Sequence, residues 1–405
     1  MTRGRASRRL LAFVAIPMLS AVTPLLAFPA ISSNFGAFGW AAIALGQSFG
    51  AAAAVLIELG WGLTGSQRIA RASEKNRRKL LAASLATKLV VVPVAVPVAV
   101  IAAILAPEFS TEAALACIGS ALVGLSSIWF FIGAGSPGKI LVTDSIPRLV
   151  FVTSAALWMN AGGPLVSFGL ALILSSLIAL ALALRTAGVR PRDFSIVRGR
   201  RLWLFLRAQM TALSGRAVSA LYIALPVALV GIVAPSVLPV FAAAERLQRL
   251  GLSVLQAVPN SLQGWVGGAR TAELRLRRAG QALGLNVVLG LISGVGFVLI
   301  APVMSEWIFA GTATLPIEIC LVSGLVIFLV CVSRATGGIV LVALKKVGII
   351  SVSAFAGAVV GVPAILLLAA TFGAIGALLG EVIAEGTVLA VQSSAVVRGI
   401  GRGRR

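Results

Sequence analysis

Two pairs of ionisable residues lie within long apolar runs of this chain, where a charged side chain is energetically costly and therefore suggests a function. Glu245 and Arg249 are four residues apart, and so are Glu381 and Glu385. Side chains with this spacing share one face of an α-helix. A charge at membrane depth is expensive unless it has a partner, water or a route to the interface. The two pairs are therefore candidates for binding or ion coupling.

Several basic residues occupy similar apolar surroundings. Arg216 lies about 13 residues beyond Trp203, roughly 20 Å along a helix, which predicts a position near the middle of a membrane. If Glu245 pairs with Arg249, the remaining guanidinium groups form an excess of positive charge. Guanidinium groups bind diphosphates through charge-assisted, often bidentate hydrogen bonds. Pairing between helices explains the pattern equally well. The predicted anion-binding residues are Arg216, Arg246, Arg249, Arg334 and Lys88.

The acidic pair admits two interpretations. No basic residue lies near Glu381 and Glu385 in the sequence, and two carboxylates at this spacing are costly to ionise together in a low dielectric. The pair, with Glu245, is therefore a candidate site for a coupling proton or sodium ion. The alternative is structural, with Arg334 or Lys88 as partners from other helices.

The chain contains no histidine, so histidine catalysis and histidine metal ligation are excluded. Its three cysteines, Cys117, Cys320 and Cys331, lie in separate apolar runs and form no CxxC pattern. We predict no metal site, no cofactor and no enzymatic activity.

Composition places these residues in a membrane protein. The chain has 405 residues, of which 59% are hydrophobic and 11% charged, and its mean hydropathy is +1.05. A soluble domain carries about 25% charged residues. The net charge of +22 would suggest nucleic acid in a soluble protein. Here it is explained by basic cytoplasmic loops, so no nucleic-acid partner is predicted.

Apolar runs bounded by glycine, proline and charge predict about twelve transmembrane helices. The fifth is the shortest and is expected to extend a few residues in either direction. The predicted spans are 10–29, 37–59, 80–106, 113–133, 149–160, 165–184, 203–233, 237–265, 279–302, 316–343, 347–369 and 373–397.

Alternate connections hold nearly all of the 34 basic residues, above all the segments 60–79 and 185–202. Lys139 and Arg148 are predicted to flank one such inner loop. By the positive-inside rule, both termini lie in the cytoplasm. Glu108, Glu112, Glu306 and Glu318 fall in the short predicted outer loops. The chain is therefore predicted to lie in the inner (plasma) membrane.

The basic segment 185–202 lies near the midpoint and divides the chain into halves 1–202 and 203–405. A weak repeat supports this division, since GWGLTGSQR begins at Gly60 and GWVGGAR begins at Gly264, each after the equivalent span. We predict an all-α membrane protein of two six-helix bundles related by a pseudo-two-fold axis along the membrane normal.

Two segments carry a resemblance to a known family. They are ELGWGLTGSQRIAR, at 58–71, and VFAAAERLQRLGLSVLQAVPNSL, at 240–262. The second is similar to a Y-x-A-A-x-R segment, with Phe241 at the aromatic position. The chain resembles polysaccharide exporters of the multidrug/oligosaccharidyl-lipid/polysaccharide exporter superfamily, especially Wzx-like flippases. The resemblance implies movement of a polyprenyl-diphosphate-linked oligosaccharide across the inner membrane, for cell-surface polysaccharide biosynthesis.

The partners expected from this resemblance are the lipid-linked glycan, the bilayer, H⁺ or Na⁺ as coupling ion, and other polysaccharide-assembly proteins. A secondary exporter of drugs or metabolites is the main alternative. A polysaccharide polymerase or glycosyltransferase is a weaker one, because the predicted outer loops are short and the sequence contains no D-x-D motif.

Overall fold

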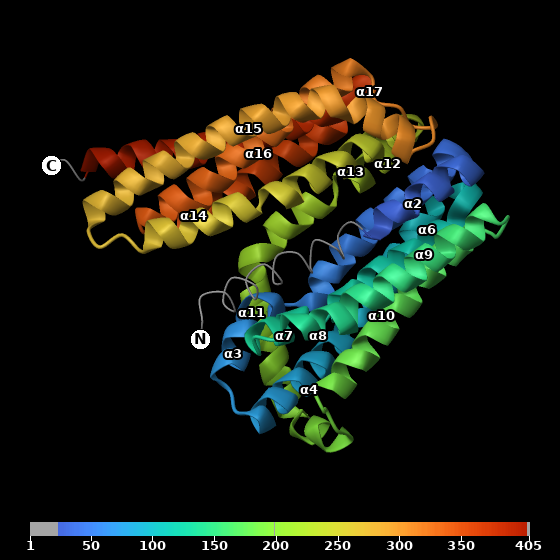
Figure 1. Cartoon of the computed structure of the whole chain (residues 1–405), viewed down its shortest axis with the longest axis horizontal. Helices are drawn as coiled ribbons and strands as arrows, with labels where there is room; N and C mark the ends of the chain where they lie inside the picture. The colour runs from blue at the N-terminus through green and yellow to red at the C-terminus, as the bar shows by residue number, and fades with distance from the viewer. Residues whose placement is uncertain (1–22, 198, 403–405) are drawn as a thin grey trace. The chain divides into compact units, whose positions relative to one another are not determined.

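The structure is a computed structural model that describes residues 23–197 and 199–402. These residues are predominantly helical, and none of them forms a strand (Figure 1). The chain separates into two compact units, Met1–Leu225 and Pro226–Arg405. This contact boundary lies inside the predicted seventh span, and the division of the halves at 202/203 stays a prediction.

Eight helical segments of the described chain are long and apolar enough to cross a membrane. The last of them contains two helices, which meet at Gly373. The segments are Phe28–Glu58, Glu74–Ile104, Pro107–Gly133, Pro137–Asn160, Val166–Thr186, Ala272–Ile308, Ile317–Leu341 and Gly348–Arg398.

The first unit begins with the 3-10 turn η1 (Thr23–Leu26) and the long helix α2 (Phe28–Glu58), which turns sharply at Gly36. A short helix α3 (Trp61–Arg71) follows. The next elements are α4 (Glu74–Val91), η2 (Val92–Val94), α5 (Ala95–Ile104), η3 (Pro107–Phe109), α6 (Ser110–Ala121), η4 (Leu122–Leu125) and α7 (Ile128–Gly133). Glycines bring α2 and α6 together, because a Cβ on Gly46 or Gly50 would collide with carbonyl groups of α6.

The first unit continues with α8 (Pro137–Ile140), the π-helix η5 (Leu141–Ser145), α9 (Ile146–Asn160), α10 (Val166–Thr186), η6 (Pro191–Ile196) and α11 (Arg200–Ala224). The fifth span is longer than the sequence indicated, since it begins at Pro137 rather than near 149. The physical reason is that Asp144 and Arg148 form an ion pair within it, so the predicted inner loop is shorter and excludes Arg148.

The second unit contains α12 (Pro226–Val233), η7 (Pro235–Val237), α13 (Leu238–Leu255), α14 (Ala257–Gly267), α15 (Ala272–Ile308), α16 (Ile317–Ala335), the π-helix η8 (Thr336–Leu341) and α17 (Gly348–Arg402). Helices α15 and α16 cross closely at Gly294 and Gly324, where a Cβ on either residue would stand 2.7 Å from the other's carbonyl oxygen. Helix α17 packs on α12, α13 and α16.

Three predicted spans are not among the eight apolar segments. The first lies mostly outside the described residues. The seventh is divided where α11 ends and Pro226 begins α12, and the eighth is divided into α13 and α14. The eighth is less apolar because it contains Glu245, Arg246 and Arg249.

Candidate functional site

The second unit holds a group of ionisable side chains on three helices that pack against one another, α13, α16 and α17. We refer to this group as the charged cluster. Its members are Glu245, Arg246, Arg249, Arg334, Glu381 and Glu385. Apart from the i, i+4 pairs, nothing in the sequence links α13 to α17, so their meeting depends on tertiary packing.

Glu245 and Arg249 form the ion pair that their spacing predicted. Arg249 Nε donates to Glu245 Oε1 over 2.7 Å, and Arg249 Nη2 donates to the same oxygen. The carboxylate is buried, with 4% of Glu245 exposed, whereas the Arg249 side chain is 37% exposed. The neighbouring Arg246 interacts electrostatically with both residues. The pair thus has a buried acidic end and an accessible basic end.

Arg334 joins α16 to α13. Its Nη1 donates to the backbone carbonyl oxygen of Leu252 over 2.9 Å. It also interacts electrostatically with Arg249 and with Glu385 of α17. Between the same two helices, Gln248 of α13 donates to the Ser323 hydroxyl of α16 over 3.0 Å. Sequence analysis missed this buried polar pair, although Gln248 lies between the charged residues of α13.

The two acids of α17, Glu381 and Glu385, interact with charged residues of α13 and α16. Glu381 is 6% exposed and interacts electrostatically with Glu245, Arg249 and Glu385. Glu385 is half-buried and interacts with Arg334. Among the described residues, neither carboxylate has a hydrogen bond or a close ion pair with another side chain. They stand near the arginines without being fixed to them.

The cluster therefore contains as many carboxylates as guanidinium groups. The sequence suggested an excess of positive charge on α13 and α16, because it could not show that Glu381 and Glu385 lie beside these helices. A balanced cluster can exchange partners, since an incoming anion or cation changes which acid and which base remain paired.

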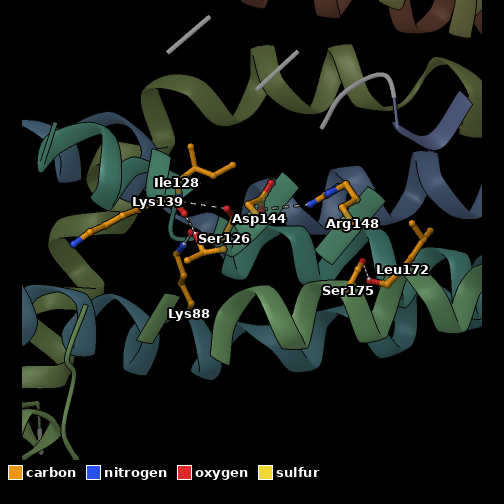
Figure 2. Close-up of polar contacts among 9 residues, drawn as sticks. Lys88, Ser126, Ile128, Lys139, Asp144, Arg148, Leu172 and Ser175 are labelled. Carbon is orange, nitrogen blue, oxygen red and sulfur yellow. Dashed lines mark hydrogen bonds and ion pairs between the residues drawn. The ribbon is translucent and has the colours of Figure 1, made fainter. Parts of the chain in front are cut away.

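Lys88 lies in the first unit. It is 1% exposed, and its Nζ donates to the carbonyl oxygen of Ser126 over 3.0 Å (Figure 2). Ser126 lies between η4 and α7, where the fourth span is interrupted. Lys88 also interacts electrostatically with Glu58. Its amine thus satisfies a carbonyl group that the broken helix leaves without its usual partner.

Asp144 and Arg148 form a second buried pair in the first unit, which sequence analysis did not single out. Their closest N–O distance is 3.7 Å, and Asp144 is 5% exposed (Figure 2). Asp144 lies on the π-helix η5. The i, i+4 spacing of an acid and a base was the available signal, but Arg148 was assigned to a loop. Arg216 belongs to α11, and its side chain lies outside the described residues.

No protein-family model and no curated protein sequence matches this chain, but solved structures match almost all of it. An inward-facing multidrug resistance MATE family transporter of the MOP superfamily is 17% identical, with a TM-score of 0.68 over 97% of each chain. The lipid II flippase MurJ, inward closed, is 13% identical, with a TM-score of 0.63 over 95% of this chain and 87% of that chain.

A MOP superfamily transporter from Pyrococcus furiosus is 16% identical, with a TM-score of 0.57 over 97% of this chain and 95% of that chain. These likenesses concern the fold. They confirm the predicted fold class, an all-α membrane protein of about twelve spans in two lobes. The chain is thus similar in fold to the MATE and MurJ transporters of the MOP superfamily.

Proposed function

We propose that the protein is a secondary transporter that moves a polyprenyl-diphosphate-linked oligosaccharide across the inner membrane by alternating access, for cell-surface polysaccharide biosynthesis. The observation that carries the proposal is the charged cluster, whose members are buried or half-buried among the helices of a fold shared with transporters. Charges at such depth are costly to maintain, and in membrane proteins they mark substrate and ion pathways.

The arginines supply the groups that a diphosphate needs. Arg249 is the more exposed end of its pair with Glu245, and a diphosphate oxygen can replace the carboxylate as acceptor of its N–H groups. Arg246 and Arg334 add two further guanidinium groups. Arg216 and Lys88, predicted from sequence as further substrate contacts, belong to the first unit and are proposed to act there.

The carboxylates supply a means of coupling. When Glu385 or Glu381 is neutralised by a proton or a sodium ion, Arg334 and Arg249 lose part of the negative charge around them. Their attraction for an anionic substrate then increases. When the cation leaves, the carboxylates again compete for the guanidinium groups. Binding of the cation and binding of the diphosphate are therefore proposed to favour each other.

A small-molecule exporter is the second candidate. It is supported by the balance of three carboxylates and three guanidinium groups, because such a cluster also accommodates cationic or zwitterionic molecules. One of the structures of similar fold is described as a multidrug resistance transporter. A carrier of this kind would recognise its substrate without a diphosphate.

The experiment that separates the candidates is depletion of the protein in cells that make the polysaccharide. A flippase requires that the lipid-linked oligosaccharide accumulates on the cytoplasmic leaflet, measured by mass spectrometry of extracted lipids. Restoring the wild-type protein should clear the intermediate, whereas the Arg249→Ala variant should not. Normal levels of the intermediate after depletion would reject the flippase and favour the small-molecule exporter.

A further inference from the structure

A row of polar residues continues from the charged cluster along α17, the last helix of the second unit. Gln392 follows Glu385 by seven residues, two helical turns or roughly 10 Å, on the same face of α17. Gln392 is 3% exposed, and its Nε2 donates to the Ser353 hydroxyl over 3.2 Å. Its Oε1 is buried and has no hydrogen-bond partner among the described residues. A buried amide oxygen without a protein partner usually accepts a hydrogen bond from an ordered water molecule.

Two consecutive glycines make room beside this amide. They lie on the π-helix η8, whose i→i+5 hydrogen bonds widen the backbone locally. Gln392 Nε2 stands 3.0 Å from the place where a Cβ on Gly337 would be. Gln263 Nε2 of α14 stands 3.1 Å from the corresponding place on Gly338. Two glutamine amides thus occupy the space that side chains on the glycines would fill.

Gln263, the member of this row farthest from the charged cluster, is exposed. It lies four residues before the end of α14, near the start of α15, where Arg278 of α15 donates to the carbonyl oxygen of Trp265 over 2.8 Å. At the same end, Lys346 donates to the carbonyl oxygen of Ala395 over 2.9 Å. Basic connections of this kind are cytoplasmic in the proposed topology.

We propose that Gln263, the glycines of η8, Ser353 and Gln392 line a water passage through which a proton moves from Glu385 to the cytoplasm. The proposal rests on the coupling role proposed for the charged cluster. Amide and hydroxyl groups hold water without titrating, so the proton passes from the Glu385 carboxyl group to water. The carboxylate that remains interacts with Arg334 and with Glu381, and Glu381 in turn interacts with Glu245 and Arg249.

The test is the accessibility of cysteines to a charged, membrane-impermeant methanethiosulfonate reagent added to inside-out vesicles. The buried native cysteines, Cys117, Cys320 and Cys331, are first replaced by alanine. Leu389→Cys places a thiol on the face of α17 that carries Glu385 and Gln392. Ala390→Cys is its matched control, because it is at almost the same depth on an exposed face of the helix.

Leu389→Cys is expected to react several times faster than Ala390→Cys. Adding Gly337→Val, whose side chain presses against the Gln392 amide, should slow the reaction at position 389 to the control rate. Gln263→Cys, on the cytoplasmic side of Gly337→Val, should stay reactive, and an unchanged melting temperature shows that the Gly337→Val protein is folded. Equal labelling rates for Leu389→Cys and Ala390→Cys would overturn the passage. So would a labelling rate at position 389 that Gly337→Val does not change.

The labelling result does not depend on transport, so the two proposals fail separately. Slow labelling at position 389 overturns the passage even if Glu385→Gln stops gradient-driven transport. Conversely, normal gradient-driven transport by the double variant Glu381→Gln, Glu385→Gln overturns the coupling role of the cluster and, with it, the proton as the passage's cargo.

Discussion

Arg334 in α16 donates a hydrogen bond from Nη1 to the backbone carbonyl oxygen of Leu252 in α13, across 2.9 Å. The same guanidinium group interacts electrostatically with Glu385 in α17. One side chain therefore links three helices of the second unit. Its two roles, as a hydrogen-bond donor and as a charge, can be separated by substitution.

Arg334→Lys keeps the charge near Glu385 but loses the geometry of the bond to Leu252, whereas Arg334→Leu loses both. Hydrogen bonds of charged groups contribute about 1.5–3 kcal/mol, so both variants should melt earlier in detergent. Transport in proteoliposomes should persist in part for the lysine variant and stop for the leucine variant. Normal transport by Arg334→Leu would remove Arg334 from the proposed site.

Arg249→Ala should stop export and also lower stability. The buried Glu245 carboxylate loses its hydrogen-bond donor, which costs roughly 1–3 kcal/mol. The double variant Glu245→Gln, Arg249→Ala removes the unpaired charge and should recover most of the melting temperature. It should not recover export, measured as clearance of the lipid-linked intermediate. Recovery of both would mean that Arg249 serves only to neutralise Glu245.

Glu381→Gln and Glu385→Gln together should leave the protein folded but make transport insensitive to the ion gradient. Neutral amides cannot bind and release a proton, and they bind a cation weakly. The measurement is substrate movement in proteoliposomes with and without an imposed proton or sodium gradient. A matched control is Glu318→Gln at the start of α16, which should respond to the gradient like the wild type. If the double variant also responds normally, the coupling site lies elsewhere.

Reporter fusions at Arg190 and Arg405 test the orientation. Both positions belong to basic segments, so both should be active only with a reporter that works in the cytoplasm. A fusion in the connection at residues 162–164, between α9 and α10, should show the opposite behaviour. A periplasmic signal at either arginine would reverse the proposed topology.

Gly373→Ala should destabilise the fold. Gly373 has φ 62° and ψ −139°, a conformation that residues with a Cβ adopt at a cost of about 1–3 kcal/mol. The added Cβ would also stand 3.2 Å from Val237 Cγ1. Gly296→Ala, in the middle of α15 with nothing within 4 Å of its Cβ position, is the control and should not lower stability. Equal melting temperatures for the two variants would contradict this account.

The helices were largely predictable from sequence because apolar runs of membrane length have few other stable forms. The pairing of Glu245 with Arg249 was predictable for a similar reason, since it depends only on helical spacing. The breaks were harder to predict. The interruption of the fourth span at Ser126 and the two π-helices were not predicted from the sequence.

The candidate site was only partly predictable. Each charged residue was identified, but which of them meet depends on how α13, α16 and α17 pack, and packing leaves little trace in one sequence. Lys88 is one example. Its depth in the third span predicts a substrate contact, but its hydrogen bond to the Ser126 carbonyl oxygen could not be predicted from the sequence. Asp144 was overlooked because its span was predicted to start after it.

The π-helices Leu141–Ser145 and Thr336–Leu341 have a consequence for the history of the chain. A π-turn arises when one residue is added to an α-helix, and an α-helix turns by about 100° per residue. Removing one residue from η5 would therefore rotate Asp144 relative to the rest of its span. Alignments of distant relatives should accordingly place single-residue gaps at these two turns, and a relative that lacks the extra residue should carry its polar residues one position away.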